Sequence, residues 1–334
     1  MTQQMAQRAG SKVVDPNLAL ELVRVTEAAA LSAVRFMGSG DKNLVDQAAV
    51  DAMRRELSAI SISGIVVIGE GEKDEAPMLY NGEQIGSGSG PAVDIAVDPI
   101  DGTTLLSKGL PGSVAVIAMS ARGTMHVPSQ VFYMNKIAVG PAARDAIDIE
   151  APTADNLNKV ARALGKPVSE VTVVVLDRPR HADLLKEIRA AGARVKLITD
   201  GDVVAGLQTA LPESEVDVLM GIGGTPEGVI VAAALRCTGG AIHCKPWPRD
   251  DDERKRYEAE GVDLNHVYRT EELVGGDDVF FSATGASTGE LLRGVKTTGS
   301  ISRTHSVVMR SRSGTIRWIE TMHNMERLNK LAGM

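Results

Sequence analysis

Two aspartates and a threonine lie together in one short segment, Val-Asp-Pro-Ile-Asp-Gly-Thr at residues 97–103. An apolar run precedes them, so we expect a strand over residues 92–98, which Pro99 ends because proline lacks an N–H group. Carboxylates held this close offer the hard oxygen donors that bind Mg²⁺ or Mn²⁺, and such ions serve phosphate chemistry. Asp98, Asp101 and Thr103 therefore indicate a metal site suited to phosphate hydrolysis.

Spacing limits which acids of this strand can share one ion. Asp94 and Asp98 fall on the same strand face, but at about 3.3 Å per residue their Cα atoms are roughly 13 Å apart. Metal–oxygen bonds of about 2.1 Å cannot bridge that distance. Asp98 and Asp101 are separated by the expected turn and can converge, which leaves Asp94 as a structural acid or as one that supports the metal ligands.

A second acidic cluster, Gly-Glu-Gly-Glu-Lys-Asp-Glu at residues 69–75, follows an expected strand over residues 64–68. Ligands of α/β proteins bind beyond the carboxyl ends of strands. Glu70 is therefore a candidate metal ligand, and Asp74 is a candidate for positioning water. The alternative is a solvated acidic loop.

Two further strand-to-helix junctions carry polar residues. In residues 221–228, Thr225 is expected to cap a helix whose first N–H groups form a phosphate cradle. Glu227 either complements the helix dipole or binds a metal ion. Arg178 and Arg180, which flank Pro179, can grip phosphate oxygens, although an exposed arginine pair is the commoner case.

A third junction, Asp200-Gly201-Asp202, follows an expected strand over residues 195–198. Its two carboxylates suit hydrogen bonds from sugar hydroxyls. The segment also fits the nucleophile motif of haloacid-dehalogenase-type phosphatases, with Asp200 as nucleophile. That alternative leaves Glu70 and residues 98–103 without a role.

Composition excludes several classes of protein. The 334 residues are 43% hydrophobic and carry a net charge of −7, so a general affinity for nucleic acid is not expected. Apolar runs such as residues 229–235 are too short to span a membrane, and residues 1–11 lack the apolar core of a signal peptide. Cys237 and Cys244 match no zinc or redox spacing, which favours a reducing compartment. We expect a cytoplasmic protein.

The pattern of elements predicts an α/β fold with an α+β N-terminal half. Helices are expected over residues 16–37 and 44–60, a loop or irregular hairpin over 70–90, and strands over 92–98, 113–119, 131–139 and 146–149. After residue 153 helices alternate with strands at 171–176, 195–198 and 216–220, which indicates a largely parallel sheet. Strands near 278–283 and 305–310 complete it. We expect two halves, a metal-binding one over 15–150 and a substrate-binding one over 151–325, packed as one catalytic unit.

These motifs, taken in order, resemble a known family. Residues 40–43, 69–72, 76–80, 98–103, 180–181, 200–202 and 221–228 match the pattern of class II fructose-1,6-bisphosphatases over about residues 15–325. Asp-Pro-Ile-Asp-Gly-Thr by itself marks the wider lithium-sensitive, Mg²⁺-dependent phosphatase superfamily. Some members carry Glu where this chain has Asp101, a change that bears on metal preference.

The resemblance implies an α-β-α-β-α layered sandwich, assembly as a homodimer or homotetramer, and a gluconeogenic role. It implies Mg²⁺ or Mn²⁺ ligands at Asp46, Glu70, Asp98, Asp101 and Glu227. It implies substrate contacts from Asp101, Gly102, Thr103, Tyr133, Arg180, His181, Ala182, Asp200, Gly201, Asp202 and Gly224.

The resulting hypothesis is hydrolysis of the 1-phosphate of fructose 1,6-bisphosphate, a small sugar bisphosphate. Thr103 orients the attacking water, with Asp74 or Glu70 as base, and Arg180 anchors the distal phosphate. Sedoheptulose 1,7-bisphosphate, inositol phosphates and nucleotide phosphates are alternative substrates. The alternative from another class, a sugar-phosphate sensor without catalysis, is disfavoured because the candidate ligands and Thr103 are all present.

Overall fold

The computed structural model describes residues 18–69, 79–126, 128 and 131–331. Its helices are α1 (Leu18–Ala33), α2 (Lys42–Ser58), α3 (Thr103–Ser107), α4 (Thr153–Leu164), α5 (Ala182–Ala190), α6 (Val203–Gln208), α7 (Thr225–Thr238), α8 (Asp251–Ala259), α9 (Thr270–Leu273) and α10 (Met325–Leu331). Within that part of the chain, no helix has both the length and the apolar character of a membrane span.

The first sheet gathers strands from both ends of the chain in the order β12-β13-β11-β4-β3-β1-β2, with β14 on the free side of β13. Its strands are β1 (Ser63–Ile68), β2 (Gln84–Ile85), β3 (Ala92–Asp101), β4 (Val114–Ala121), β11 (Phe280–Gly285), β12 (Lys296–Thr298), β13 (Ile301–Arg310) and β14 (Thr315–Asn324). Only β1 and β3 run parallel among its described strand pairs.

The second sheet has the order β10-β9-β5-β8-β6-β7. Its strands are β5 (Tyr133–Val139), β6 (Thr172–Leu176), β7 (Arg194–Ile198), β8 (Val218–Gly224), β9 (Ala241–Pro246) and β10 (Tyr268–Arg269). β6 runs parallel to β7 and β8, whereas β5 is antiparallel to β8 and β9. The expectation of a largely parallel sheet is therefore wrong, because β5 enters between two strands of the later segment.

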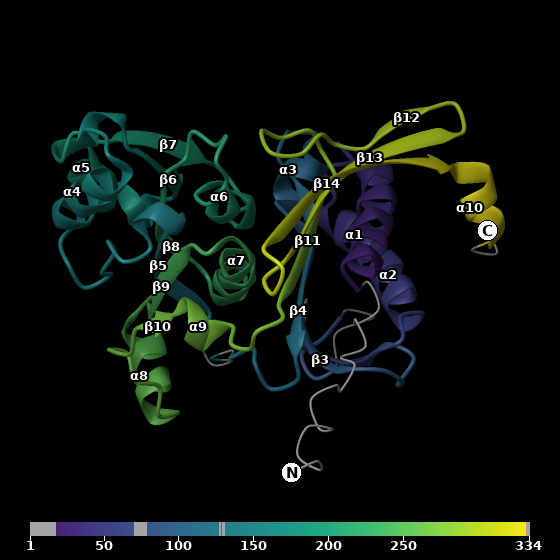
Figure 1. The fold of residues 1–334 in the computed structure, drawn as a ribbon, viewed down its shortest axis with the longest axis horizontal. Coiled ribbons are helices and arrows are strands. Elements are labelled where there is room, and N and C mark those ends of the chain that lie inside the picture. Colours follow the sequence, from purple (N-terminus) through teal and green to yellow (C-terminus); the bar gives the residue numbers. More distant parts are fainter. Residues whose placement is uncertain (1–17, 70–78, 127, 129–130, 332–334) are drawn as a thin grey trace, which may run out of the picture.

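Five layers stack across the molecule (Figure 1). Helices α1 and α2 pack on the outer face of the first sheet around one buried cluster. Helix α7, almost wholly buried, lies between the two sheets and contacts β3, β4 and β11 on one side and β5, β8 and β9 on the other. Helices α4 and α5 cover the far face of the second sheet. The α/β class and the expected α-β-α-β-α order are confirmed.

Several elements differ from the sequence-based expectations at their ends. Strand β3 does not stop at Pro99 but continues to Asp101, with a register shift against β4 between Asp98 and Asp101. Such a bulge tolerates the missing N–H of proline. The glycines of residues 221–224 are not a loop but the end of β8, and Gly224 rather than Thr225 occupies the N-cap position of α7.

One expected strand is absent and several real strands were not expected. Residues 146–149 form turns and irregular backbone instead of a strand. Strand β9 and the long strand β14 lie in segments to which no strand was assigned. Sheet membership also crosses the expected boundary near residue 150, because β5 joins the second sheet and β11–β14 return to the first. The division into halves over 15–150 and 151–325 stays a prediction.

Candidate active site

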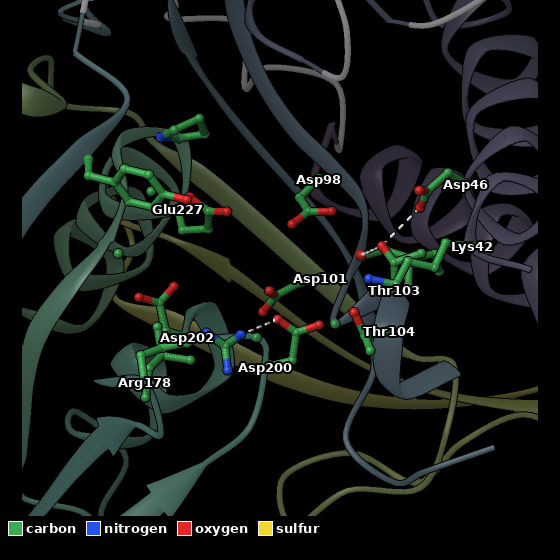
Figure 2. Close-up of a pocket in the computed structure, with 18 of the residues that line it drawn as sticks. Lys42, Asp46, Asp98, Asp101, Thr103, Thr104, Arg178, Asp200, Asp202 and Glu227 are labelled. Atoms are coloured by element: carbon green, nitrogen blue, oxygen red, sulfur yellow. Dashed lines mark hydrogen bonds and ion pairs between the residues drawn. The ribbon is translucent and has the colours of Figure 1, made fainter. Parts of the chain in front are cut away.

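A cavity of about 440 Å³ opens where the two sheets approach each other, at the ends of β3, β5 and β8. Most of the side chains predicted from the sequence face it (Figure 2). Those that line it are Asp46, Asp98, Asp101, Gly102, Thr103, Tyr133, Arg180, Asp200, Gly201, Asp202, Gly224 and Glu227. They come from six separate segments of the chain, so only the tertiary fold brings them together.

The end of β3 presents the two central acids. Asp98 and Asp101 both line the cavity, and Asp101 is buried, with its Oδ2 atom accepting a 3.2 Å hydrogen bond from the backbone N–H of Val203. Gly102 follows with a φ of 81°, a left-handed conformation that glycine adopts without strain. This turn starts α3 at once and places Thr103 beside the acids.

Thr103 and Asp46 form a second group. In Figure 2 they lie on one side of Asp98 and Asp101, and Asp202 and Glu227 lie on the other. The Thr103 hydroxyl lies 2.9 Å from Asp46 Oδ1 and 2.9 Å from the Ile100 carbonyl oxygen. Burial raises the pKa of Asp46 to about 6, although the hydrogen bond from Thr103 acts in the other direction. Helix α2, capped by Asp41, carries Asp46 to this position.

The remaining acids crowd the other wall of the cavity. Burial raises the pKa of Asp101 well above its ordinary value, and the carboxylates of Asp202, Glu227 and Asp200 raise it further. Burial likewise raises the pKa of Glu227, with Asp202 as the next cause. The Oε2 atom of Glu227 is buried and has no hydrogen-bond partner among the described residues. This surplus of buried negative charge makes the cavity suited to a cation.

The donor set fits a hard divalent ion, since all of these candidate ligands are carboxylates. The side chains are not drawn into a closed shell, because no group of three His, Cys, Asp or Glu residues within the described ranges is placed to hold an ion. Glu70 and Asp74, the candidate ligand and base, lie outside the described residues. Gly69, which immediately precedes Glu70, lines the cavity.

Arginines and an aromatic ring form the part of the cavity that belongs to the second sheet. Arg180 lies 5.1 Å from the centre of the Tyr133 ring and donates a 2.9 Å hydrogen bond to the carbonyl of Ile222. Arg178 donates to the Thr199 carbonyl at 2.6 Å and contacts Asp200 Oδ1 at 3.3 Å. These cations offer a binding place for a phosphate, with Asp200 as an acidic neighbour of Arg178.

Two predicted substrate-binding residues do not reach the cavity. His181 is 1% exposed, and both ring nitrogens are used by the backbone: Nδ1 lies 2.6 Å from the Leu176 carbonyl, and Nε2 accepts from the Ile222 N–H at 2.7 Å. Ala182 is exposed at the start of α5. Asp94 does not line the cavity either: Arg122 and the N–H groups of Thr124 and Met125 contact it, as expected for a structural acid.

Sequence reasoning missed two cationic residues of the site. Lys42 lines the cavity, as does the expected Arg178, and Lys136 lies directly behind it, 2% exposed and 2.5 Å from Asp202 Oδ2. Burial by itself lowers the pKa of Lys136, but the nearby carboxylates of Asp202 and Glu227 and the hydrogen bond to Asp202 together raise it above its ordinary value. A lysine within the otherwise apolar second half of β5 was the signal that could have revealed it.

Comparisons with known proteins agree with this site. Residues 16–323 match the family model of bacterial fructose-1,6-bisphosphatase, glpX-encoded. The chain is 46% identical over 324 residues to fructose-1,6-bisphosphatase 1 class 2 of Escherichia coli strain K12, covering 93% of this chain and 96% of that protein. The class 2 enzyme of Shigella flexneri gives the same identity and coverage.

A solved structure with a more distant likeness is the extragenic suppressor protein suhB from Bartonella henselae, with 14% identity, a TM-score of 0.35, and coverage of 58% of this chain and 72% of that one. Membership of the wider lithium-sensitive superfamily stays a prediction. The family model covers nearly the whole chain, and the close relatives are covered over almost their full length. The chain therefore belongs to the family of bacterial class 2 fructose-1,6-bisphosphatases.

Proposed function

We propose that this protein hydrolyses the 1-phosphate of fructose 1,6-bisphosphate, giving fructose 6-phosphate and inorganic phosphate. The observation that carries the proposal is that one cavity is lined both by Asp46, Asp98 and Asp101 around Thr103 and by the cations Arg178 and Arg180 beside Tyr133. A bisphosphate needs two such environments, one for the phosphate that is cleaved and one for the phosphate that is only held. The family and its relatives support this substrate.

The acidic part fits Mg²⁺ or Mn²⁺, with Asp46, Asp98, Asp101 and Glu227 as ligands from the described residues and Glu70 as a fifth. When bound, such an ion neutralises phosphate oxygens and lowers the pKa of a bound water. The unpartnered Oε2 of Glu227 supports its assignment as a ligand.

The chain's own groups then orient the reactants. The Thr103 hydroxyl, already 2.9 Å from Asp46, holds the attacking water in line with phosphorus. The water oxygen bonds to phosphorus as the bond to the sugar O1 breaks, and Asp74 or Glu70 takes the proton that water releases. O1 takes a proton from solvent, so that the sugar leaves as a neutral alcohol, and the base returns its proton to solvent.

The other residues hold the part of the substrate that does not react. Arg180 binds the 6-phosphate by charge-assisted hydrogen bonds, and Tyr133 stacks beside it. Asp200 and Asp202 accept hydrogen bonds from sugar hydroxyls, next to the backbone of Gly201 and Gly224. Holding a substrate by groups remote from the reacting bond supplies binding energy that orients the reacting phosphate.

The predicted role is a gluconeogenic step in the cytoplasm, carried out by a homodimer or homotetramer. Sedoheptulose 1,7-bisphosphate is the alternative substrate that the same cavity accommodates most simply, because it too carries two terminal phosphates. Inositol and nucleotide phosphates complete the set of alternatives.

The deciding experiment measures inorganic phosphate released from fructose 1,6-bisphosphate in the presence of Mg²⁺ or Mn²⁺. We expect metal-dependent release that Asp98→Asn abolishes and that Asp183→Asn, a change at an exposed carboxylate on α5, leaves intact. No release from folded wild-type protein contradicts the proposal and directs the test to the alternative phosphates. An acyl phosphate trapped on Asp200 favours the haloacid-dehalogenase route instead.

A further inference from the structure

A buried ammonium group lies directly behind the sugar side of the cavity. Lys136 of β5 is 2% exposed, and its Nζ atom lies 2.5 Å from Asp202 Oδ2 and 3.3 Å from the carbonyl oxygen of Gly224. Asp202 lines the cavity and Lys136 does not. Gly224 in turn is the N-cap residue of α7, whose first turn carries Glu227. One lysine thus joins the loop expected to bind the sugar to the helix expected to bind the metal.

We infer that Lys136 is a positioning residue of the hydrolysis reaction, which acts by fixing the Asp202 carboxylate relative to the start of α7. The inference rests on the proposed function, because it assigns to Asp202 a contact with the sugar. Lys136 does not touch the substrate in this arrangement. It determines where Asp202 stands when the substrate arrives.

The backbone around this ion pair is shaped to admit it. Strand β8 lies beside β5, with Gly223 opposite Met134 and Gly224 opposite Tyr133. A Cβ atom on Gly223 would lie 2.4 Å from Asp202 Oδ2 and 2.5 Å from Lys136 Nζ. Any side chain at this position collides with both charged groups, so the ion pair depends on glycine here.

Stability alone is a weak reason for such an ion pair. Removing two charges from water is costly, and well-packed apolar residues often stabilise a fold as well as a buried ion pair does. A second lysine–aspartate pair lies beside the same sheet: Lys166, after α4, and Asp217, just before β8, keep 27% and 13% of their side chains exposed. That pair lies away from the cavity, whereas the deeply buried pair lies against it. The protein therefore buries an ion pair at the position where a carboxylate must be held in one orientation.

The test compares four proteins by phosphate release from fructose 1,6-bisphosphate: wild type, Lys136→Met, Asp202→Asn and the double variant. Lys166→Met is the matched control. We expect Lys136→Met to lose about a hundredfold in kcat/KM, the loss typical of a group misplaced by about 1 Å, and to lose it mainly through KM. Lys166→Met should stay within about twofold of wild type, as for changes remote from a site.

The double variant separates positioning from a general loss of structure. If Lys136 acts through Asp202, the double variant should match Asp202→Asn to within about threefold, because the second change then has nothing further to remove. Losses that multiply overturn the inference, and so does a Lys136→Met protein with wild-type KM and kcat. Circular dichroism and thermal unfolding accompany each measurement.

Two remaining outcomes are also decisive. If Lys136→Met fails to fold because it leaves Asp202 unpaired, the comparison of the double variant with Asp202→Asn takes its place, and a double variant that also fails to fold assigns Lys136 to folding and overturns the inference. If wild type itself releases no phosphate, the proposed function fails. That result is distinct from an active wild type whose Lys136 variant is normal, which contradicts only the positioning role.

Discussion

The proposed role of Thr103 depends on its hydroxyl group alone. This hydroxyl lies between Asp46 and the Ile100 carbonyl. Thr103→Ala removes this hydroxyl and leaves the side chains around it in place. We expect kcat for fructose 1,6-bisphosphate to fall by about 10²–10³, the loss seen when one positioning donor is removed from an active site, with little change in KM or melting temperature. Thr103→Ser, which keeps the hydroxyl, should retain most of the activity. Wild-type turnover in the alanine variant would exclude the proposed role.

His181 leads to a prediction about stability rather than catalysis. Burial lowers its pKa below the ordinary 6.5, so in the folded protein the ring stays neutral where the unfolded chain has begun to bind a proton. Stability rises with pH wherever the unfolded state holds more protons. The contribution of His181 is therefore complete above pH 6.5 and is lost as the pH falls through the lowered pKa of the folded state.

The measurement is urea unfolding of wild type and of His181→Gln between pH 5 and pH 8. Glutamine can donate to the Leu176 carbonyl and accept from the Ile222 N–H, but it does not titrate. We expect the variant to lose less stability than wild type on acidification. Equal slopes of unfolding free energy against pH in the two proteins would show that the ring is not the titrating group.

At the residue scale, the sequence predicted acids better than cations. Asp98 and Asp101 stand next to a proline and a glycine, in a motif typical of a metal site, and both line the cavity. Lys136 could not be found in this way, because its significance comes from Asp202, which lies 66 positions away in the chain. A charge on a mostly apolar strand was visible, but its partner depends on the tertiary fold.

Among the elements, the glycine-rich end of β8 leaves little space for a side chain, and this supports a prediction. A Cβ atom on Gly224 would lie 1.9 Å from Glu227 Oε2, so Gly224→Ala must turn that carboxylate away. Because Glu227 is a proposed metal ligand, we expect the Mg²⁺ concentration for half-maximal activity to rise about 10- to 100-fold, as for disturbed ligand orientation. The melting temperature should change little, since the end of a side chain can move.

The control is Gly275→Ala. Its added Cβ atom would meet its nearest neighbour at 3.5 Å, an ordinary contact, and residue 275 lies outside the cavity lining. Both variants are titrated with Mg²⁺ and their activity is measured as phosphate release. The comparison tests the same glycine-to-alanine change at a tight position and at an open one. An unchanged Mg²⁺ requirement in Gly224→Ala counts against Glu227 as a ligand.

Elements with a clear local signal were predicted well. Helices α1 and α2 and strands β1, β4, β6 and β7 lie within a few residues of their expected positions. The errors arose where local signals conflict: Pro99 lies inside β3 at a bulge, and glycines 221, 223 and 224 lie inside β8. In both places backbone pairing with a neighbouring strand overrides the local preference, and that neighbour is not visible in the sequence.

For the whole molecule, the five layers agree with the family resemblance. Local sequence patterns alone did not predict this layered order. The two sheets exchange strands, since β5 crosses into the later sheet and β11–β14 return to the earlier one. Helix α7 is buried on nearly every side because both sheets pack on it. The cavity lies at the same junction, so its two halves come from segments that are far apart in the chain.

The long hairpin of β13 and β14 presents an edge strand with exposed apolar side chains. Strand β14 pairs with β13 and with no other strand of the described residues, and α10 extends beyond it at the periphery (Figure 1). On this strand Trp318 is 47% exposed and Met322 is 67% exposed. A long edge strand with exposed apolar side chains is a surface that proteins usually cover.

A second copy of the chain is the partner we expect, because the proposed homodimer or homotetramer can place β14 of two copies together across a two-fold axis. Light scattering should then give wild type a mass that is a multiple of 35.3 kDa. Trp318→Glu buries a charge in that contact and should shift the mass towards one chain. Leu20→Glu, at an apolar residue of α1 that is 43% exposed, should leave the mass unchanged. A wild-type monomer, or an assembly that tolerates Trp318→Glu, means that β14 does not form the contact between subunits.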